Sequence, residues 1–127
     1  MRAPKLLLDR YPIIRSTNVA EIEHTILGTY GAQWFDVGGR SSLLQVHANY
    51  WRSPGVALSF GRNDGAEIKV SYSGVCYFRQ HFAISGSANL RIGRRQHELS
   101  PLSSCLVPAG EPLGLKFAPG FENLVIR

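Results

Sequence analysis

Four histidines and two cysteines are the side chains with the clearest capacity for metal binding or covalent chemistry. No two of the histidines lie close together in the sequence, where they occupy positions His24, His47, His81 and His97. Both cysteines, Cys76 and Cys105, lie in apolar, strand-like runs, where a free thiol behaves as a small hydrophobic side chain. The serines lack the Gly-x-Ser-x-Gly turn of an activated nucleophile, and there is no phosphate-binding loop. We therefore expect no metal, no cofactor and no catalytic residue.

Polar and aromatic side chains on otherwise apolar strand faces suggest a different chemistry, the binding of a small molecule. Ligand pockets are mostly apolar and carry a few directed polar groups. Gln80 lies between Phe78 and Phe82, and Tyr72 ends the apolar face that Ile68 and Val70 begin. On these grounds the expected ligand-binding residues are Trp34, Tyr50, Arg52, Tyr72, Gln80 and Phe82.

Arg52 indicates which chemical class of ligand is expected. Tyr50 and Arg52 continue the face of Val46 and Ala48, so an inward orientation is expected for both. A buried arginine without a partner is costly, and its planar fork matches a carboxylate. An inward Arg52 would therefore bind a carboxylate ligand. The alternative for all six residues is ordinary core packing or, for Arg52, a strand-end charge in water.

One helix is predicted ahead of the strands. Asn18 can cap it, and Glu21 follows three residues later as in a capping box. Apolar residues then recur at helical spacing up to Tyr30, and Gly28 or Gly31 ends the helix. Prolines before the helix favour an extended arm over residues 1–16.

After the helix the apolar residues alternate with polar ones, which predicts about eight to ten short strands separated by glycine- and proline-rich turns. Turns are expected at 53–55, at 73–74 and at 93–95, and the run 63–65, Asn-Asp-Gly, is a strong hairpin signal. One long strand over 76–84 places Gln80 on one face and His81 on the other, and we expect the Gln80 face to line the pocket. A jelly roll or closed barrel accommodates such a set of strands.

The composition fits a globular domain. At 127 residues the chain is expected to form a single domain over 1–127, and its net charge of +5 permits contact with acidic partners. The basic cluster of Arg91, Arg94 and Arg95 is confined to one turn without interleaved aromatic residues, so nucleic-acid contact is not expected from it. No signal peptide and no apolar stretch of about 20 residues is present, so we expect a cytoplasmic protein without membrane contact.

The chain stops at Arg127, directly after the apolar run 124–126. Natural chains usually end in exposed, poorly ordered residues. We therefore expect this sequence to be a fragment of a longer protein.

Two stretches of the sequence resemble a known family. The first is the helix start at 15–21, and the second runs from Phe82 to Phe117 and includes the segments 84–86, 90–93 and 106–110. Together they resemble the N-terminal, cupin-like sensor domain of AraC-family transcription regulators. The resemblance implies an all-β fold, a double-stranded β-helix (the cupin or jelly-roll barrel), with one short N-terminal helix.

The resemblance also implies a function and partners. Such domains bind a small effector, for which we expect a carboxylate or an aromatic metabolite, and regulate a C-terminal DNA-binding domain with two helix-turn-helix motifs. That domain is not present in this chain, so DNA contact and a possible homodimer would belong to the full-length bacterial protein.

Two alternatives remain open from the sequence. In a stand-alone cupin enzyme, a metal is usually held by a close histidine pair, a nearby carboxylate and a histidine after a Pro-x-Gly turn. This chain lacks the histidine pair, and Glu111 and Pro112 follow its turn at 108–110. The other alternative is a barrel with a filled interior that serves only for dimerisation.

Overall fold

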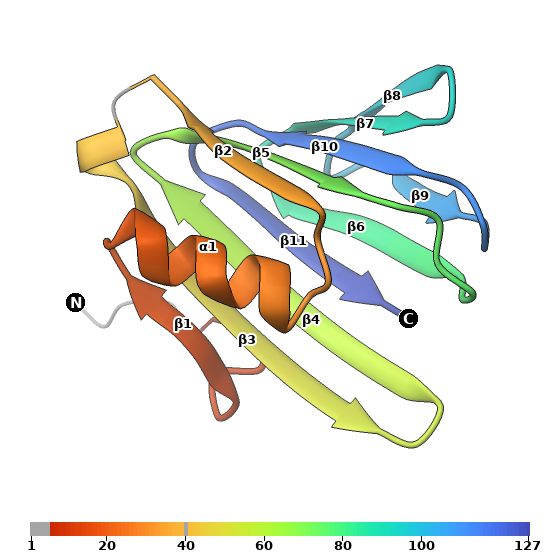
Figure 1. The fold of residues 1–127 in the computed structure, drawn as a ribbon, viewed down its shortest axis with the longest axis horizontal. Coiled ribbons are helices and arrows are strands. Elements are labelled where there is room, and N and C mark those ends of the chain that lie inside the picture. Colours follow the sequence, from red (N-terminus) through yellow and green to blue (C-terminus); the bar gives the residue numbers. More distant parts are fainter. Residues whose placement is uncertain (1–5, 40) are drawn as a thin grey trace.

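The computed structural model describes residues 6–39 and 41–127 and consists of two antiparallel sheets and one α-helix (Figure 1). The six-stranded sheet has the order β1 (Pro12–Ser16), β3 (Gln45–Ser53), β4 (Val56–Asp64), β11 (Phe121–Ile126), β6 (Arg79–Ser85) and β9 (Ser104–Val107). The five-stranded sheet has the order β2 (Trp34–Gly38), β5 (Glu67–Tyr72), β10 (Leu113–Phe117), β7 (Ala88–Ile92) and β8 (Arg95–Leu99). The predicted all-β fold with one short helix is confirmed.

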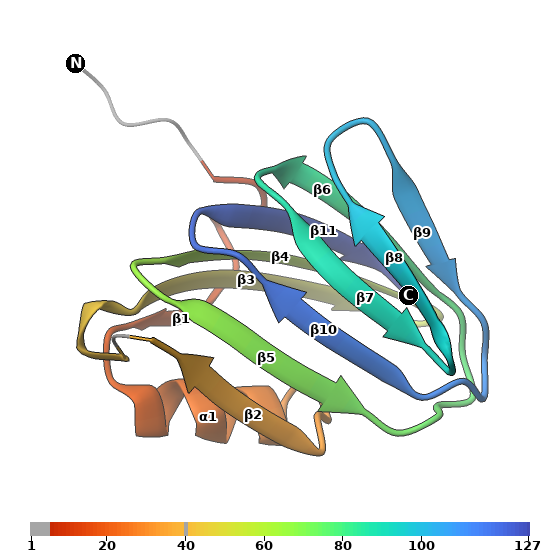
Figure 2. The same cartoon turned by 90° about the horizontal axis from the view of Figure 1, so that it is seen from above.

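The two sheets lie face to face, as Figure 2 shows, and their inner faces form the core. Alternate residues point inward, so the buried side chains recur with period two along β5 and β7. Two clusters of buried side chains result. One gathers around Leu44 and Ile68, and the other around Leu113 and Phe121.

The helix α1 (Val19–Gly28) lies at the edge of the sandwich and contacts both β1 and β2 (Figure 1). The Asn18 side chain accepts a hydrogen bond from the backbone N–H of Glu21, which confirms the predicted cap. Ile22 is fully buried by the helix packing. Among the described residues, no helix is long and apolar enough to cross a membrane.

The extended arm predicted for residues 1–16 is confirmed in part. Its second half forms β1, which pairs with β3, after a turn over 7–10. Residues 1–5 lie outside the described part of the chain.

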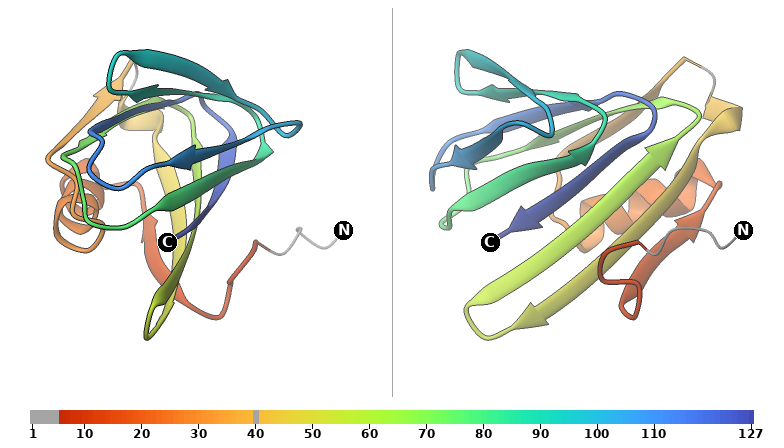
Figure 3. Two further views of the ribbon diagram at one scale, coloured as in Figure 1. Left: turned by 90° about the vertical axis from the view of Figure 1, so that its right-hand side faces the viewer. Right: turned by 180° about the vertical axis from the view of Figure 1, so that it is seen from behind.

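The longest hairpin joins β3 to β4 through Pro54 and Gly55 and extends beyond the rest of its sheet (Figure 3). Gly55 has φ +82°, the conformation that the third position of a type II turn requires. The backbone groups of Ala57, near the start of β4, exchange two hydrogen bonds with those of Arg127. The end of β11 is thereby fixed beside this hairpin.

The hairpin predicted at residues 63–65 is wrong. The strands on either side of the turn, β4 and β5, belong to different sheets, so the turn carries the chain from one layer of the sandwich to the other. Gly65 has φ +81°, and the short 3₁₀ helix at Ser41–Leu43 packs directly against it. The sequence correctly predicts a tight turn at Gly65, but a turn of this kind can also form a corner between two sheets.

The inward face predicted for the strand over 76–84 is also wrong. Strand β6 begins only at Arg79, and its buried residues are Arg79, His81 and Ala83. Phe78, on the opposite face, is 61% exposed. Beyond Ala83 the pairing with β11 is irregular, because Ser85 lies opposite Glu122 and Ala83 opposite Asn123. Strand β6 therefore carries one extra residue, Ile84, as a β-bulge.

Candidate ligand-binding cavity

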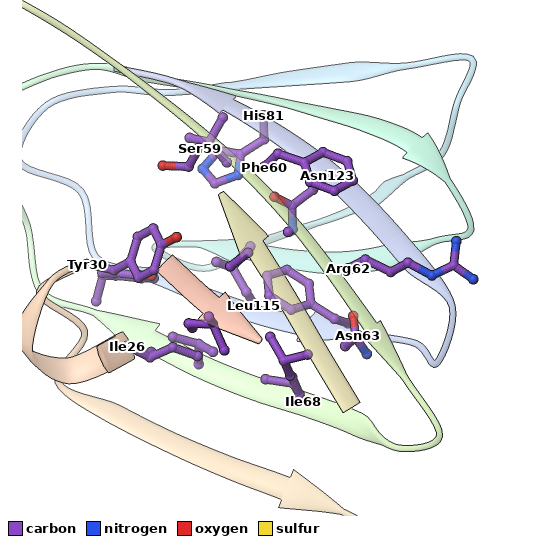
Figure 4. A pocket seen from close by; sticks show the side chains of 18 of the residues that line it. Ile26, Tyr30, Ser59, Phe60, Arg62, Asn63, Ile68, His81, Leu115 and Asn123 are labelled. Atoms are coloured by element: carbon purple, nitrogen blue, oxygen red, sulfur yellow. The ribbon is translucent and has the colours of Figure 1, made fainter. Parts of the chain in front are cut away.

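A cavity of about 120 Å³ lies between the two sheets, where α1 approaches them (Figure 4). Most of its wall is apolar and comes from α1 and from strands of both sheets, through residues that include Ile14, Ile26, Val46, Ile68, Val70, Leu115 and Phe117. Its polar side chains are Tyr30, Ser59, Asn63, Tyr72, Arg79, His81, Asn123 and Arg127. The backbone of β4 around Gly61 adds to the wall, whereas the Arg62 side chain points away (Figure 4). This is the composition expected of a small-molecule pocket.

Arg79 and His81 project into the interior from β6. They are only 4% and 5% exposed. The Nε and Nη2 atoms of Arg79 and the Nε2 atom of His81 are buried, and none of the three has a hydrogen-bond partner among the described residues. Because buried polar atoms in proteins are nearly always hydrogen-bonded, these three atoms mark the polar end of the cavity.

The environment of β6 disfavours positive charge. Burial lowers the pKa of Arg79, nearby Tyr77 and Tyr72 partly oppose this, and the positive charge of Arg127 lowers the pKa further. The pKa of His81 is lowered to about 4, first by burial and then by the charge of Arg79. His81 is therefore a neutral imidazole near pH 7, whereas Arg79 keeps its charge because an arginine titrates far above neutrality.

Tyrosines surround the two arginines of the cavity. The Arg79 guanidinium lies over the ring of Tyr72, 5.4 Å from its centroid. Arg127 donates hydrogen bonds to the hydroxyl oxygens of Tyr77 and Tyr50 at 2.8 and 2.7 Å. Burial raises the pKa of Tyr72 to about 12, so its hydroxyl is neutral. Arginine–ring contacts of this kind stabilise the cations only in part, because the rings carry no net charge.

Solved structures with similar architecture are numerous, although no family model and no curated protein matches this sequence. A cupin superfamily protein from Desulfitobacterium hafniense aligns with a TM-score of 0.55 over 65% of this chain and 75% of its own, at 20% identity. The AraC-like transcriptional activator CuxR aligns with a TM-score of 0.58 over 72% of this chain, at 13% identity. This chain has the cupin fold.

Cupins of this architecture have different functions. The match to CuxR covers 38% of that protein, and an oxalate decarboxylase aligns with a TM-score of 0.55 over 64% of this chain, at 15% identity. A regulator and an enzyme thus share the fold, so the function must be argued from the cavity itself.

The residues that line the cavity do not fit a metal. His81 is the one imidazole among the lining residues, and these include no carboxylate or thiolate. Across residues 6–39 and 41–127, no three side chains of His, Cys, Asp or Glu come together. The Arg79 charge beside His81 also repels a cation.

The structure places the six predicted ligand-binding residues in different parts of the cupin. Tyr72 lines the cavity. Tyr50 lies next to it, since its hydroxyl accepts a hydrogen bond from Arg127 and its ring packs edge-on against Tyr30. The other four do not line the cavity. Trp34 is 49% exposed and lies in a groove beside Lys69 and Lys116. Arg52 is exposed near the end of β3. Gln80 donates a hydrogen bond to the Ser104 hydroxyl, and Phe82 lies opposite Leu124 of β11.

The sequence analysis did not select Arg79, His81 and Arg127. A signal was present for two of them, since Tyr77, Arg79 and His81 alternate on one face of the predicted strand. The sequence analysis instead predicts that the opposite face, which carries Gln80, lines the pocket. The charge that was expected to point inward from Arg52 comes instead from Arg79.

Replacing Arg79 with methionine is expected to stabilise the unliganded domain. The change removes a buried cation without a charged partner and keeps most of the side chain's volume, so we expect a gain of about 2 kcal/mol in the free energy of unfolding. Urea denaturation measures it. The matched control is Arg91→Met on the exposed side of β7, for which a change within about 0.5 kcal/mol is expected. A clear loss of stability in the Arg79 variant would contradict this reading of the site.

Proposed function

We propose that this chain is the small-molecule-sensing domain of an AraC-type bacterial transcription regulator. In this proposal the effector binds in the cavity, and a C-terminal helix-turn-helix domain outside this chain contacts DNA. The domain acts in the cytoplasm, and any homodimer forms in the full-length protein. The similarity of the fold to the CuxR activator supports the regulatory assignment.

One observation carries the proposal more than any other. Arg79 and His81 are buried two residues apart on β6 in a cavity whose wall is mostly apolar, and three of their nitrogen atoms have no partner among the described residues. A barrel filled only for dimerisation gains nothing from this arrangement, which costs stability. A binding site gains from it, because the polar atoms give a ligand both affinity and orientation.

Ligand binding can change the arrangement of α1 and of the β11 end, because residues from both regions line the cavity. Ile26 belongs to α1, Tyr30 follows that helix closely, and Arg127 lies at the end of β11. A ligand that contacts these side chains more favourably in one arrangement shifts the population toward that arrangement. The position of α1 or of the β11 end then depends on occupancy.

The test is chromatin immunoprecipitation of the natural, full-length gene product in its own host. A regulator is expected to be enriched at discrete promoters, and transcripts from the same promoters are expected to change in a deletion strain. Absence of promoter enrichment would overturn the proposed function. Neither measurement requires the effector to be known.

A further inference from the structure

Two arginines of the described chain allow a direct comparison of the same chemical group with and without an acceptor. Arg62 donates from Nε to Oδ2 of Asp64 at 2.9 Å and from Nη2 to Oδ1 at 3.1 Å. Its remaining nitrogen, Nη1, donates to Glu122. One edge of the Arg62 guanidinium thus holds a carboxylate with two parallel hydrogen bonds, the bidentate geometry that arginine favours.

Arg79 presents the same edge to the interior. Its Nε and Nη2 are the two buried nitrogens that no acceptor of the described residues reaches. No lining residue of the cavity carries a carboxylate, and the nearby charge of Arg127 adds to the positive potential. The two hydrogens of this edge point in parallel, so one acceptor group with two oxygen atoms satisfies both.

His81 limits which groups fit beside that edge. It lies two residues along β6 and is itself buried, with Nε2 also unpartnered. Through this one nitrogen a neutral imidazole contributes a single hydrogen bond and no charge. A group with a single negative charge therefore finds a charged, bidentate donor and one neutral partner.

The size of the cavity limits the remainder of the ligand. A cavity of about 150 Å³ lined by apolar side chains accommodates benzene, and the present one has about 120 Å³. The surrounding wall of Val70, Leu115 and Phe117 is apolar. The body of the ligand is therefore no larger than one ring or one branched chain of about six carbon atoms, which excludes a nucleotide or a long acyl chain.

We propose that the effector is a small monocarboxylate with an aromatic or branched aliphatic body, and that its carboxylate accepts two hydrogen bonds from Nε and Nη2 of Arg79. This inference rests on the proposed function only in calling the ligand an effector. The binding itself is a separate claim and is tested separately.

The test uses calorimetric titration of the purified chain with benzoate and with 4-methylpentanoate, each compared with its own amide. The amides keep the shape of the acids and lose the charge. We expect both acids to bind in the micromolar to millimolar range, and each amide to bind at least about tenfold more weakly, since charge-assisted hydrogen bonds are about twice as strong as neutral ones.

The Arg79→Lys variant tests the geometry, because lysine keeps the charge and lacks the planar fork. We expect acid binding to weaken at least about tenfold in it, and to remain unchanged in the control Arg91→Lys. Circular dichroism confirms that each variant is folded. Arg79→Met, which is expected to be more stable than the wild type, is a second variant that lacks the planar guanidinium.

Three outcomes would overturn the inference: neither acid binds at millimolar concentration, the amides bind as tightly as the acids, or Arg79→Lys and Arg79→Met keep the wild-type affinity. Promoter enrichment without acid binding would contradict the ligand class and leave the regulatory function standing. Acid binding without promoter enrichment would support the ligand class and overturn the regulatory function.

Discussion

Lowering the pH from 7 to 4 is expected to reduce the free energy of unfolding by about 3 kcal/mol through His81 alone. Burial and then the charge of Arg79 lower the pKa of this imidazole from 6.5 to about 4. Between these two values the unfolded chain binds a proton that the folded chain does not bind. Stability is therefore fully present above about pH 6.5 and is lost progressively as the pH falls toward 4.

Urea denaturation at a series of pH values measures this dependence. The His81→Gln variant removes the titrating group, so its stability is expected to fall less steeply between pH 6.5 and 4. His97→Gln, at an exposed position on β8, is the matched control and should retain the wild-type slope. Equal slopes in wild type and His81→Gln would show that His81 is not the group responsible.

The Gly65→Ala substitution is expected to destabilise the domain by about 4 kcal/mol. Gly65 has φ +81°, where an alanine is strained, and its Cβ would lie 1.9 Å from the carbonyl oxygen of Leu43. That oxygen belongs to backbone, so the 3₁₀ helix at Ser41–Leu43 would have to move away from the turn. Thermal or chemical denaturation measures the loss.

Gly55→Ala separates the two causes. Gly55 has a nearly equal φ of +82°, but no atom lies within 4 Å of the position that its Cβ would take. Backbone strain alone then predicts a loss of about 1 kcal/mol. Equal losses in the two variants would contradict the close contact between Leu43 and the corner turn.

Local elements of this fold could be predicted from the sequence, whereas the partners of the strands could not. The helix cap at Asn18 and the hairpin turn at Pro54 and Gly55 depend on side chains and dihedral angles within a few residues, which the sequence contains. The turn at Gly65 shows the limit. Its conformation was evident, but which sheet receives the next strand depends on long-range packing.

The cavity was predicted only in outline. Alternation in β6 divides its residues into two sets without saying which set is buried. Because Phe82 and Phe78 lie on one side and Arg79 and His81 on the other, apolar character favoured the wrong side. Tertiary structure reverses this expectation, since the cavity wall includes the buried polar atoms of Arg79 and His81, which a simple core would exclude.

The bulge at Ile84 makes the chemistry of this cavity sensitive to chain length. Strand β6 has one residue more than β11 at that point, and this surplus sets which side chains downstream and upstream turn inward. If the bulge is retained, deletion of one residue between 79 and 83 shifts the preceding part of β6 by one position. Each side chain before the deletion then points to the opposite face of the sheet, so Arg79 no longer points into the cavity. A single-residue deletion in β6 can thus remove the Arg79 charge from the cavity wall without any substitution in the wall, while Arg127 stays in place.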